Sequence, residues 1–137
     1  MGKYFTIEEL SRSSTAKAKN IKNEPNDVQK ANMEKFIKLI LDPIREKWGS
    51  AIRTNSGYRS AELNKLVGGV SNSHHRYLND YCAVDVTAGS PMKNASLFKM
   101  IKEMNLPICQ CIDEKNYKWL HISYHPVDIR KQFIHLP

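Results

Sequence analysis

The sequence predicts an α+β fold in which helices precede and separate a few short strands. Its 137 residues match the usual size of one domain, about 100–150 residues. Apolar residues recur every three or four positions over residues 33–48, which indicates a helix, and the short apolar run over 119–124 indicates a strand. Because the predicted strands are short, we expect a small antiparallel sheet with the helices packed on it.

The N-terminal half carries the helix signals. Thr6 and Glu9 have the spacing of a capping box, which predicts a short helix over residues 6–12. Asp27 is a candidate N-cap for a long helix over about residues 27–48. Pro43 lies inside that helix and predicts a kink, because proline removes a backbone donor.

The strands and later helices follow from alternation and capping signals. Ser90-Pro91 pairs an N-cap residue with proline at the first helical position, a typical helix start. The predicted strands are residues 51–55, 82–86, 108–112 and 119–124, and the predicted helices are 61–66 and 91–105. The patterns assign no element to the tail, residues 125–137. No repeat or linker marks a second domain, so we expect one domain over residues 1–137.

Composition excludes several classes of protein. Lysine and arginine exceed aspartate and glutamate by 21 − 14 = 7, which favours anionic partners, but the charge is spread evenly and forms no nucleic-acid-binding patch. The sequence has no apolar run of 18 residues and no apolar segment near its start, so we expect neither membrane insertion nor a signal peptide. Cys82, Cys109 and Cys111 are an odd number, so we expect buried thiols rather than a disulfide framework.

Candidate metal ligands occur inside apolar strands. Asp85 lies between two valines and His121 between leucine and isoleucine, and burial of an unpaired charge is costly. If the two strand faces converge, these residues and a histidine from the preceding segment supply three ligands, the usual number at a catalytic zinc. On spacing alone, Asp85 could instead pair with Arg53 or Arg59, and His121 could be a hydrogen-bonded core histidine.

Four ordered segments resemble one known family. They are Thr54–Asn64 (TNSGYRSAELN), Gly68–His75 (GGVSNSHH), Ala83–Val86 (AVDV) and Trp119–Tyr124 (WLHISY). Shorter stretches near residues 5–16 and 41–45 match as well. The chain therefore resembles the zinc D-Ala-D-Ala carboxypeptidases and L-alanyl-D-glutamate endopeptidases, which share the Hedgehog-type metallopeptidase fold and include phage endolysins. The resemblance covers roughly residues 4–124.

The resemblance implies a Zn²⁺ ion and roles for particular residues. Its zinc ligands would be His75, Asp85 and His121. Arg59 is similar to the arginine that holds a substrate carboxylate or carbonyl, a task that suits a guanidinium fork. Ser73 would hydrogen-bond the substrate or a zinc ligand, with a plain loop serine as the alternative. Tyr58 is a further candidate for substrate contact, and packing is the favoured role for it.

Two departures from the family pattern affect the site. Ten positions separate His75 from Asp85, where the family has seven, and residues 76–81 lack the expected glycine, so His74 remains an alternative ligand. Many members have an acid three residues before the last histidine, and that position is Lys118 here. A related subgroup has an acid after a Gln-x-Ile strand end, which makes Glu114 our candidate general base and Asp113 its substitute.

The resemblance implies a zinc peptidase that hydrolyses bacterial peptidoglycan stem peptides or cross-links, as a D,D-carboxypeptidase or an endopeptidase. The alternative is a non-catalytic cell-wall-binding or phage structural module of the same fold, which Lys118 and the insertion at 76–81 motivate. We expect a monomer whose partner is the peptidoglycan peptide, with no nucleic acid. A phage or prophage endolysin would be made in the host cytoplasm and act in the periplasm or cell wall.

Overall fold

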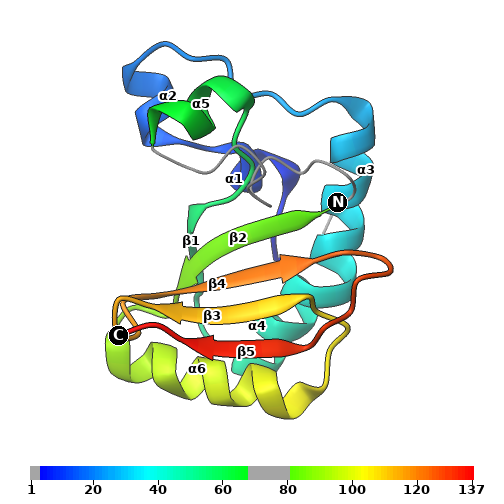
Figure 1. Cartoon of the computed structure of the whole chain (residues 1–137), viewed down its shortest axis with the longest axis vertical. Helices are drawn as coiled ribbons and strands as arrows, with labels where there is room; N and C mark the ends of the chain where they lie inside the picture. Colours follow the sequence, from blue (N-terminus) through cyan, green and yellow to red (C-terminus); the bar gives the residue numbers. More distant parts are fainter. Residues whose placement is uncertain (1–3, 68–80) are drawn as a thin grey trace.

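A computed structural model describes residues 4–67 and 81–137, which form one mixed sheet and the helices around it (Figure 1). The sheet order is β1-β2-β4-β3-β5. Its strands are β1 (Arg53–Ser56), β2 (Cys82–Thr87), β3 (Gln110–Glu114), β4 (Trp119–Tyr124) and β5 (Gln132–His135). The three inner pairings are antiparallel, whereas β5 runs parallel to β3.

Two groups of helices surround the sheet. The first group is α3 (Asp27–Phe36), η1 (Ile37–Leu41), α4 (Asp42–Trp48) and α6 (Pro91–Met104). The second is α1 (Ile7–Ser11), α2 (Ser14–Ala18) and α5 (Ala61–Leu66), which lie at the top of the view in Figure 1. Within the described residues, no helix has both the length and the apolar character needed to cross a bilayer.

One face of the sheet packs on the first helix group and forms the core. Alternate residues of the inner strands, among them Val84, Leu120 and Ile122, are buried there with Phe36 and Ile101 of the helices. Since strand side chains alternate between faces, the residues between them point to the other face of the sheet. Asp85 and His121 are two of these, so the core fixes the face on which the candidate site lies.

The helix expected over residues 27–48 contains an unexpected wide turn. Its N-cap is Asn26, one residue before the predicted N-cap Asp27, and Asn26 forms a reciprocal capping box with Gln29. Just before Pro43, the chain makes a π-helical segment in which the Asp42 N–H donates to the carbonyl of Ile37. A π turn at this point is accounted for by Pro43, which has no N–H and whose ring crowds the preceding turn.

The prediction of α+β architecture is confirmed, but the prediction of a purely antiparallel sheet is wrong. The tail, to which the sequence patterns assigned no element, returns as β5 and pairs parallel to β3, with Gln110 opposite Gln132 and Asp113 opposite His135. The N–H of Leu136 also donates to the carbonyl of Asp113 at 2.9 Å. The tail thus closes one edge of the sheet.

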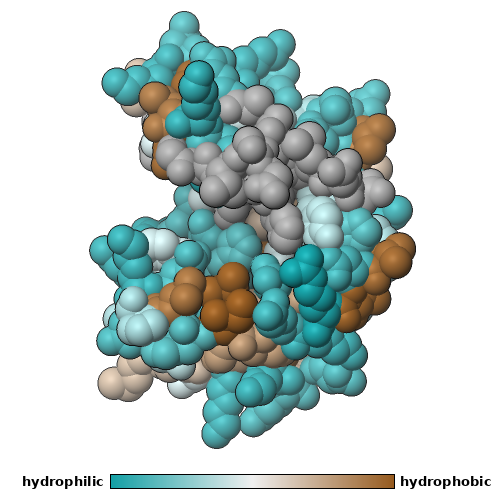
Figure 2. All heavy atoms as spheres, viewed as in Figure 1, coloured by the Kyte–Doolittle hydropathy of each residue, from teal (hydrophilic) through white to brown (hydrophobic). Residues whose placement is uncertain are grey.

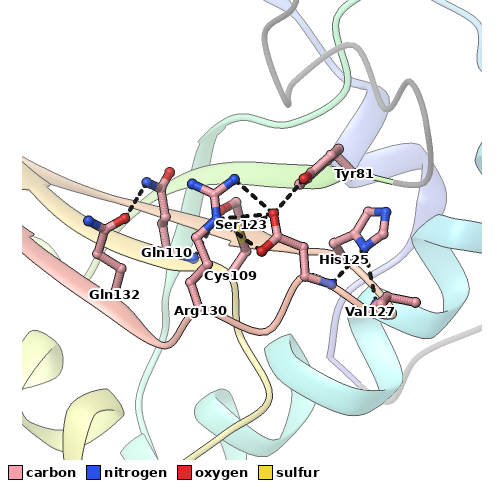
Figure 3. A network of polar contacts seen from close by, with 9 residues as sticks. Tyr81, Cys109, Gln110, Ser123, His125, Val127, Arg130 and Gln132 are labelled. Carbon is pink, nitrogen blue, oxygen red and sulfur yellow. Dashed lines mark hydrogen bonds and ion pairs between the residues drawn. The ribbon is translucent and has the colours of Figure 1, made fainter.

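A polar network holds the start of the tail against the sheet (Figure 3). Asp128 accepts hydrogen bonds from the Tyr81 hydroxyl (2.5 Å) and from Arg130 (2.7 Å at the closest). These bonds hold the pKa of Asp128 well below its ordinary value. His125 Nδ1 accepts hydrogen bonds from the backbone N–H groups of Val127 and Asp128, and its ring packs against that of Tyr81 at 4.4 Å between centroids and a tilt of 41°. The network therefore joins the tail to Tyr81, the residue immediately before β2.

Candidate active site

Three strands bring two carboxylates and a histidine together on the face opposite the core. Asp85 of β2 lies directly opposite His121 of β4, and Nδ1 of His121 is 3.0 Å from Oδ1 of Asp85. Glu114 of β3 is paired with Trp119, two positions from His121, which is a diagonal distance that a long side chain can span. One ligand atom from each of Asp85, Glu114 and His121 lies within 4.8 Å of the others.

Glu114 is oriented by its cross-strand neighbour. The indole Nε1 of Trp119 donates a hydrogen bond of 2.8 Å to Oε2 of Glu114. A hydrogen bond to an ionised carboxylate is stronger than one between neutral groups. Trp119 therefore holds the carboxylate beside His121, a role that the sequence alone did not indicate because it depends on the register of β3 against β4.

Arg59 lies on the same side of the sheet, just after β1. Burial lowers the pKa of Arg59 from its ordinary value, and the negative charges of Asp85 and Glu114 oppose that shift. The Arg59 guanidinium thus interacts electrostatically with the carboxylates of both Asp85 and Glu114. It lines a pocket of about 260 Å³ together with Tyr58 and Asp85. Other walls of that pocket come from α2 and α5, and Figure 2 shows the surface indented on the left between those helices and the sheet.

The backbone around Arg59 is fixed on both sides. The N–H of Tyr58 donates to the carbonyl of Leu10 at 2.6 Å. The Asn23 side chain donates to the carbonyls of Ser11 (2.8 Å) and Tyr58 (2.9 Å), while its oxygen accepts the N–H of Ser60 (2.8 Å). Asn23 and Leu10 thus hold the backbone on either side of Arg59, and no sequence pattern indicates either residue. A loop asparagine carries no sequence signal for such contacts.

The two remaining candidates within the described residues, Tyr58 and Asp113, are both buried. Tyr58 is 6% exposed and packs in the core cluster, although it also lines the pocket of Arg59. Asp113 follows the alternation of β3 to the other face, where it is fully buried and Oδ1 lies 2.6 Å from Nδ1 of His135. Asp113 is therefore not part of the group formed by Asp85, Glu114 and His121. Ser73, His74, His75 and the segment 76–80 lie outside the described residues.

Two carboxylates and a histidine on one sheet face, with an arginine beside them, are a donor set typical of a metal-dependent hydrolase. Comparison with protein families agrees with this class. The family model described as Peptidase M15 matches residues 3–123, and the chain belongs to this peptidase family. The resemblance found in the sequence is confirmed at that level, and the family is zinc-dependent. A search of the curated proteins finds no match.

Proposed function

We propose that this protein is a zinc-dependent peptidase that cleaves peptide bonds in the stem peptides or cross-links of bacterial peptidoglycan. The observation that carries the proposal is the group formed by Asp85, His121 and Glu114, in a chain of the Peptidase M15 family. We also propose the Hedgehog-type fold implied by the sequence motifs. A small mixed sheet with helices is compatible with it.

The residues present fit a zinc ion. Imidazole nitrogen and carboxylate oxygen are ordinary zinc ligands, and Asp85 and His121 offer one of each, 3.0 Å apart. We assign these two residues, with His75 as the third ligand, to hold the ion. When bound, zinc would polarise the scissile carbonyl and make water a better nucleophile at neutral pH.

We assign proton transfer to Glu114. Trp119 occupies Oε2, so Oε1 is the atom that would take the proton from the attacking water and pass it to the leaving nitrogen. Arg59 would bind a carboxylate or carbonyl of the peptide through paired hydrogen bonds, which fixes the scissile bond next to Glu114. We do not assign this role to Asp113, because its carboxylate lies on the other face of the strand, beside His135.

The proposal is tested by incubating purified sacculi with zinc-loaded protein and with chelated protein. Mass spectrometry of the released fragments identifies the bond and separates carboxypeptidase from endopeptidase activity. We expect release only with zinc. Binding to sacculi without release would instead support a non-catalytic wall-binding module.

Single substitutions of Glu114, Asp113 and His121 test the catalytic and zinc-binding roles assigned above. Glu114→Gln should bind zinc as the wild type does and lose kcat by roughly 100-fold or more, the usual contribution of a general base. The matched control is Asp113→Asn, the same neutralisation one residue earlier on the opposite face, which should keep kcat. His121→Ala should lose zinc and hydrolysis together. Normal turnover in Glu114→Gln would assign the base elsewhere.

We propose an endolysin-like role, in which the protein is made in a host cytoplasm and acts on the wall. We also propose that it acts as a monomer, because one chain supplies Asp85, Glu114, His121 and Arg59. Light scattering of the zinc-loaded protein measures the oligomeric state directly.

A further inference from the structure

The turn between β3 and β4 has an unusual backbone. Three consecutive residues after Glu114, namely Lys115, Asn116 and Tyr117, have φ of 49°, 55° and 65°. These values lie in the left-handed region, where a side chain crowds the following carbonyl and the conformation costs free energy. The turn begins directly at Glu114, whose carbonyl accepts the N–H of Lys118 at 3.0 Å. Contacts with other parts of the chain therefore have to hold this turn in place.

The end of the tail supplies backbone contacts on both sides of Glu114. The N–H of Leu136 donates to the carbonyl of Asp113 at 2.9 Å, and the carbonyl of Leu136 accepts the N–H of Asn116 at 3.1 Å. Asp113 precedes Glu114 by one residue, and Asn116 follows it by two. Figure 1 shows the C-terminus beside this turn, at the left end of the sheet. One tail residue thus bridges the strand and the turn that flank Glu114.

The side chain of His135 adds two contacts at the same place. Its Nδ1 lies 2.6 Å from Oδ1 of Asp113, and that oxygen also accepts the N–H of Leu136 at 3.3 Å. Asp113 is fully buried, so its carboxylate depends on such bonds in place of water. The imidazole ring also packs against the ring of Tyr117, with 5.3 Å between centroids. His135 therefore contacts both the strand before the turn and the last left-handed residue within it.

Helix α6 holds the turn from a second side. Asn94 is fully buried, and its amide donates to the carbonyls of Tyr117 (3.0 Å) and Lys118 (3.2 Å). Its oxygen accepts the N–H of Ala88 at 2.6 Å. Ala88 and Lys118 line a hollow of about 520 Å³ beside Trp119. The turn is thus fixed between α6 and the tail.

We propose that the end of β5 positions the assigned general base, with His135 as the positioning residue. By holding the left-handed turn, His135 keeps the Glu114 carboxylate on the indole of Trp119 and beside His121. Its effect on catalysis rests on the proposed peptidase function. His135 lies beyond residues 3–123, the range that the family model matches, so the positioning is a feature of this chain's own tail.

Kinetics of variants at the two ends of β5 test the role of His135. His135→Ala should lower kcat about tenfold with little change in KM, because a displaced base is a weaker catalyst while Arg59 still binds the peptide. His135→Asn places an amide N–H near the position of Nδ1 and should recover most of kcat. The matched control is Gln132→Ala, which removes an exposed hydrogen bond of 2.8 Å to Gln110 and should keep kcat. Asp113→Asn keeps an oxygen that can accept the same bond, so it should keep kcat as well.

The indole N–H of Trp119 reports the position of Glu114 without any reaction, because it donates to Oε2 at 2.8 Å. In chelated, isotope-labelled protein, His135→Ala should move this NMR signal toward its position in Glu114→Ala, which lacks the bond. The indole signal of Trp48 should stay in place. His135→Asn and Gln132→Ala should both keep the wild-type position of the Trp119 signal. A loss of stability alone would leave both indole signals of the folded protein unchanged.

The two readouts separate failure of the positioning role from failure of the peptidase function. If the wild type cleaves no peptide but the Trp119 signal moves in His135→Ala, the positioning stands and the assigned reaction fails. An unchanged Trp119 signal in His135→Ala would overturn the positioning role even in an active peptidase, and so would an unchanged kcat. Should His135→Ala fail to fold, Leu136→Pro removes the backbone donor to Asp113 and tests the same prediction, with the Trp119 signal again expected to move.

Discussion

The position of Arg59 depends on side chains that take no part in the assigned chemistry. Asn23 makes three hydrogen bonds to backbone groups of Ser11, Tyr58 and Ser60. Two of these groups flank Arg59 directly, so the guanidinium starts from a backbone with little freedom. A surface loop far away in sequence therefore determines where a substrate carboxylate or carbonyl would be held.

Asn23→Ala should lower both stability and substrate binding. Loss of three hydrogen bonds should reduce the free energy of unfolding by about 1–3 kcal/mol. It should also raise KM more than it lowers kcat, because Glu114 and its partner Trp119 are untouched. Urea unfolding and steady-state kinetics measure the two effects. The neighbouring Lys22→Ala, on an exposed side chain, should change neither. An unchanged KM in Asn23→Ala would remove its positioning role.

At the scale of elements, the second helix group meets the sheet through a very close backbone contact. A Cβ on Gly57 would lie 2.2 Å from the carbonyl oxygen of Leu10. The same stretch bonds the N–H of Tyr58 to that oxygen. Position 57 requires glycine because a side chain would collide with Leu10. Its backbone conformation is not left-handed, whereas Gly49 has a left-handed φ of +76°.

Gly57→Ala should push α1 away from the end of β1. We expect a loss of about 1–3 kcal/mol in the free energy of unfolding, as for other overpacked sites, and a fall in activity because Arg59 follows two residues later. Gly49→Ala is the matched comparison. It has open space around the Cβ, so it should cost about 1 kcal/mol of conformational strain and leave activity intact. Thermal unfolding and kinetics of the two variants distinguish a steric contact from strain, and equal losses in both would contradict the close contact.

At the scale of the whole molecule, the tail is held to the sheet by charge as well as by β5. The low pKa of Asp128 means that the folded state binds its proton more weakly than the unfolded chain does. Its contribution to stability is therefore present above the ordinary aspartate pKa, near 4, and is lost as pH falls through the lower folded pKa.

Asp128→Asn should accordingly be less stable than the wild type at pH 6, and the difference should shrink below pH 3. Urea unfolding at several pH values measures it. Glu24→Gln, at an exposed surface pair with Lys22, serves as the control and should run parallel to the wild type. A difference that stays constant down to pH 2 would show that Asp128 contributes through packing alone.

The sequence predicted the parts of this molecule that depend on local pattern. The apolar run around His121 predicted β4 with its observed bounds, and Ser90-Pro91 predicted the start of α6. Glu114 and Asp113 lie on opposite faces of β3, and the role of Glu114 as general base stays a prediction. The features that could not be predicted depend on contacts between residues that are distant in sequence. The parallel β5 is one case, because residues 132–135 carry no strong alternation and form a strand only beside β3.

The bonds of Asn94 also bear on the thermodynamics of ligand binding. Because the amide of Asn94 holds both Ala88 and Lys118 to α6, the two segments that line the hollow beside Trp119 keep their spacing before any ligand arrives. Binding there need not order a loop, so most of the conformational entropy cost falls on the peptide and on the long side chains of Arg53 and Lys118. Stem peptides constrained by cross-linking, which have less freedom to lose, should then bind more tightly than free ones with the same contacts.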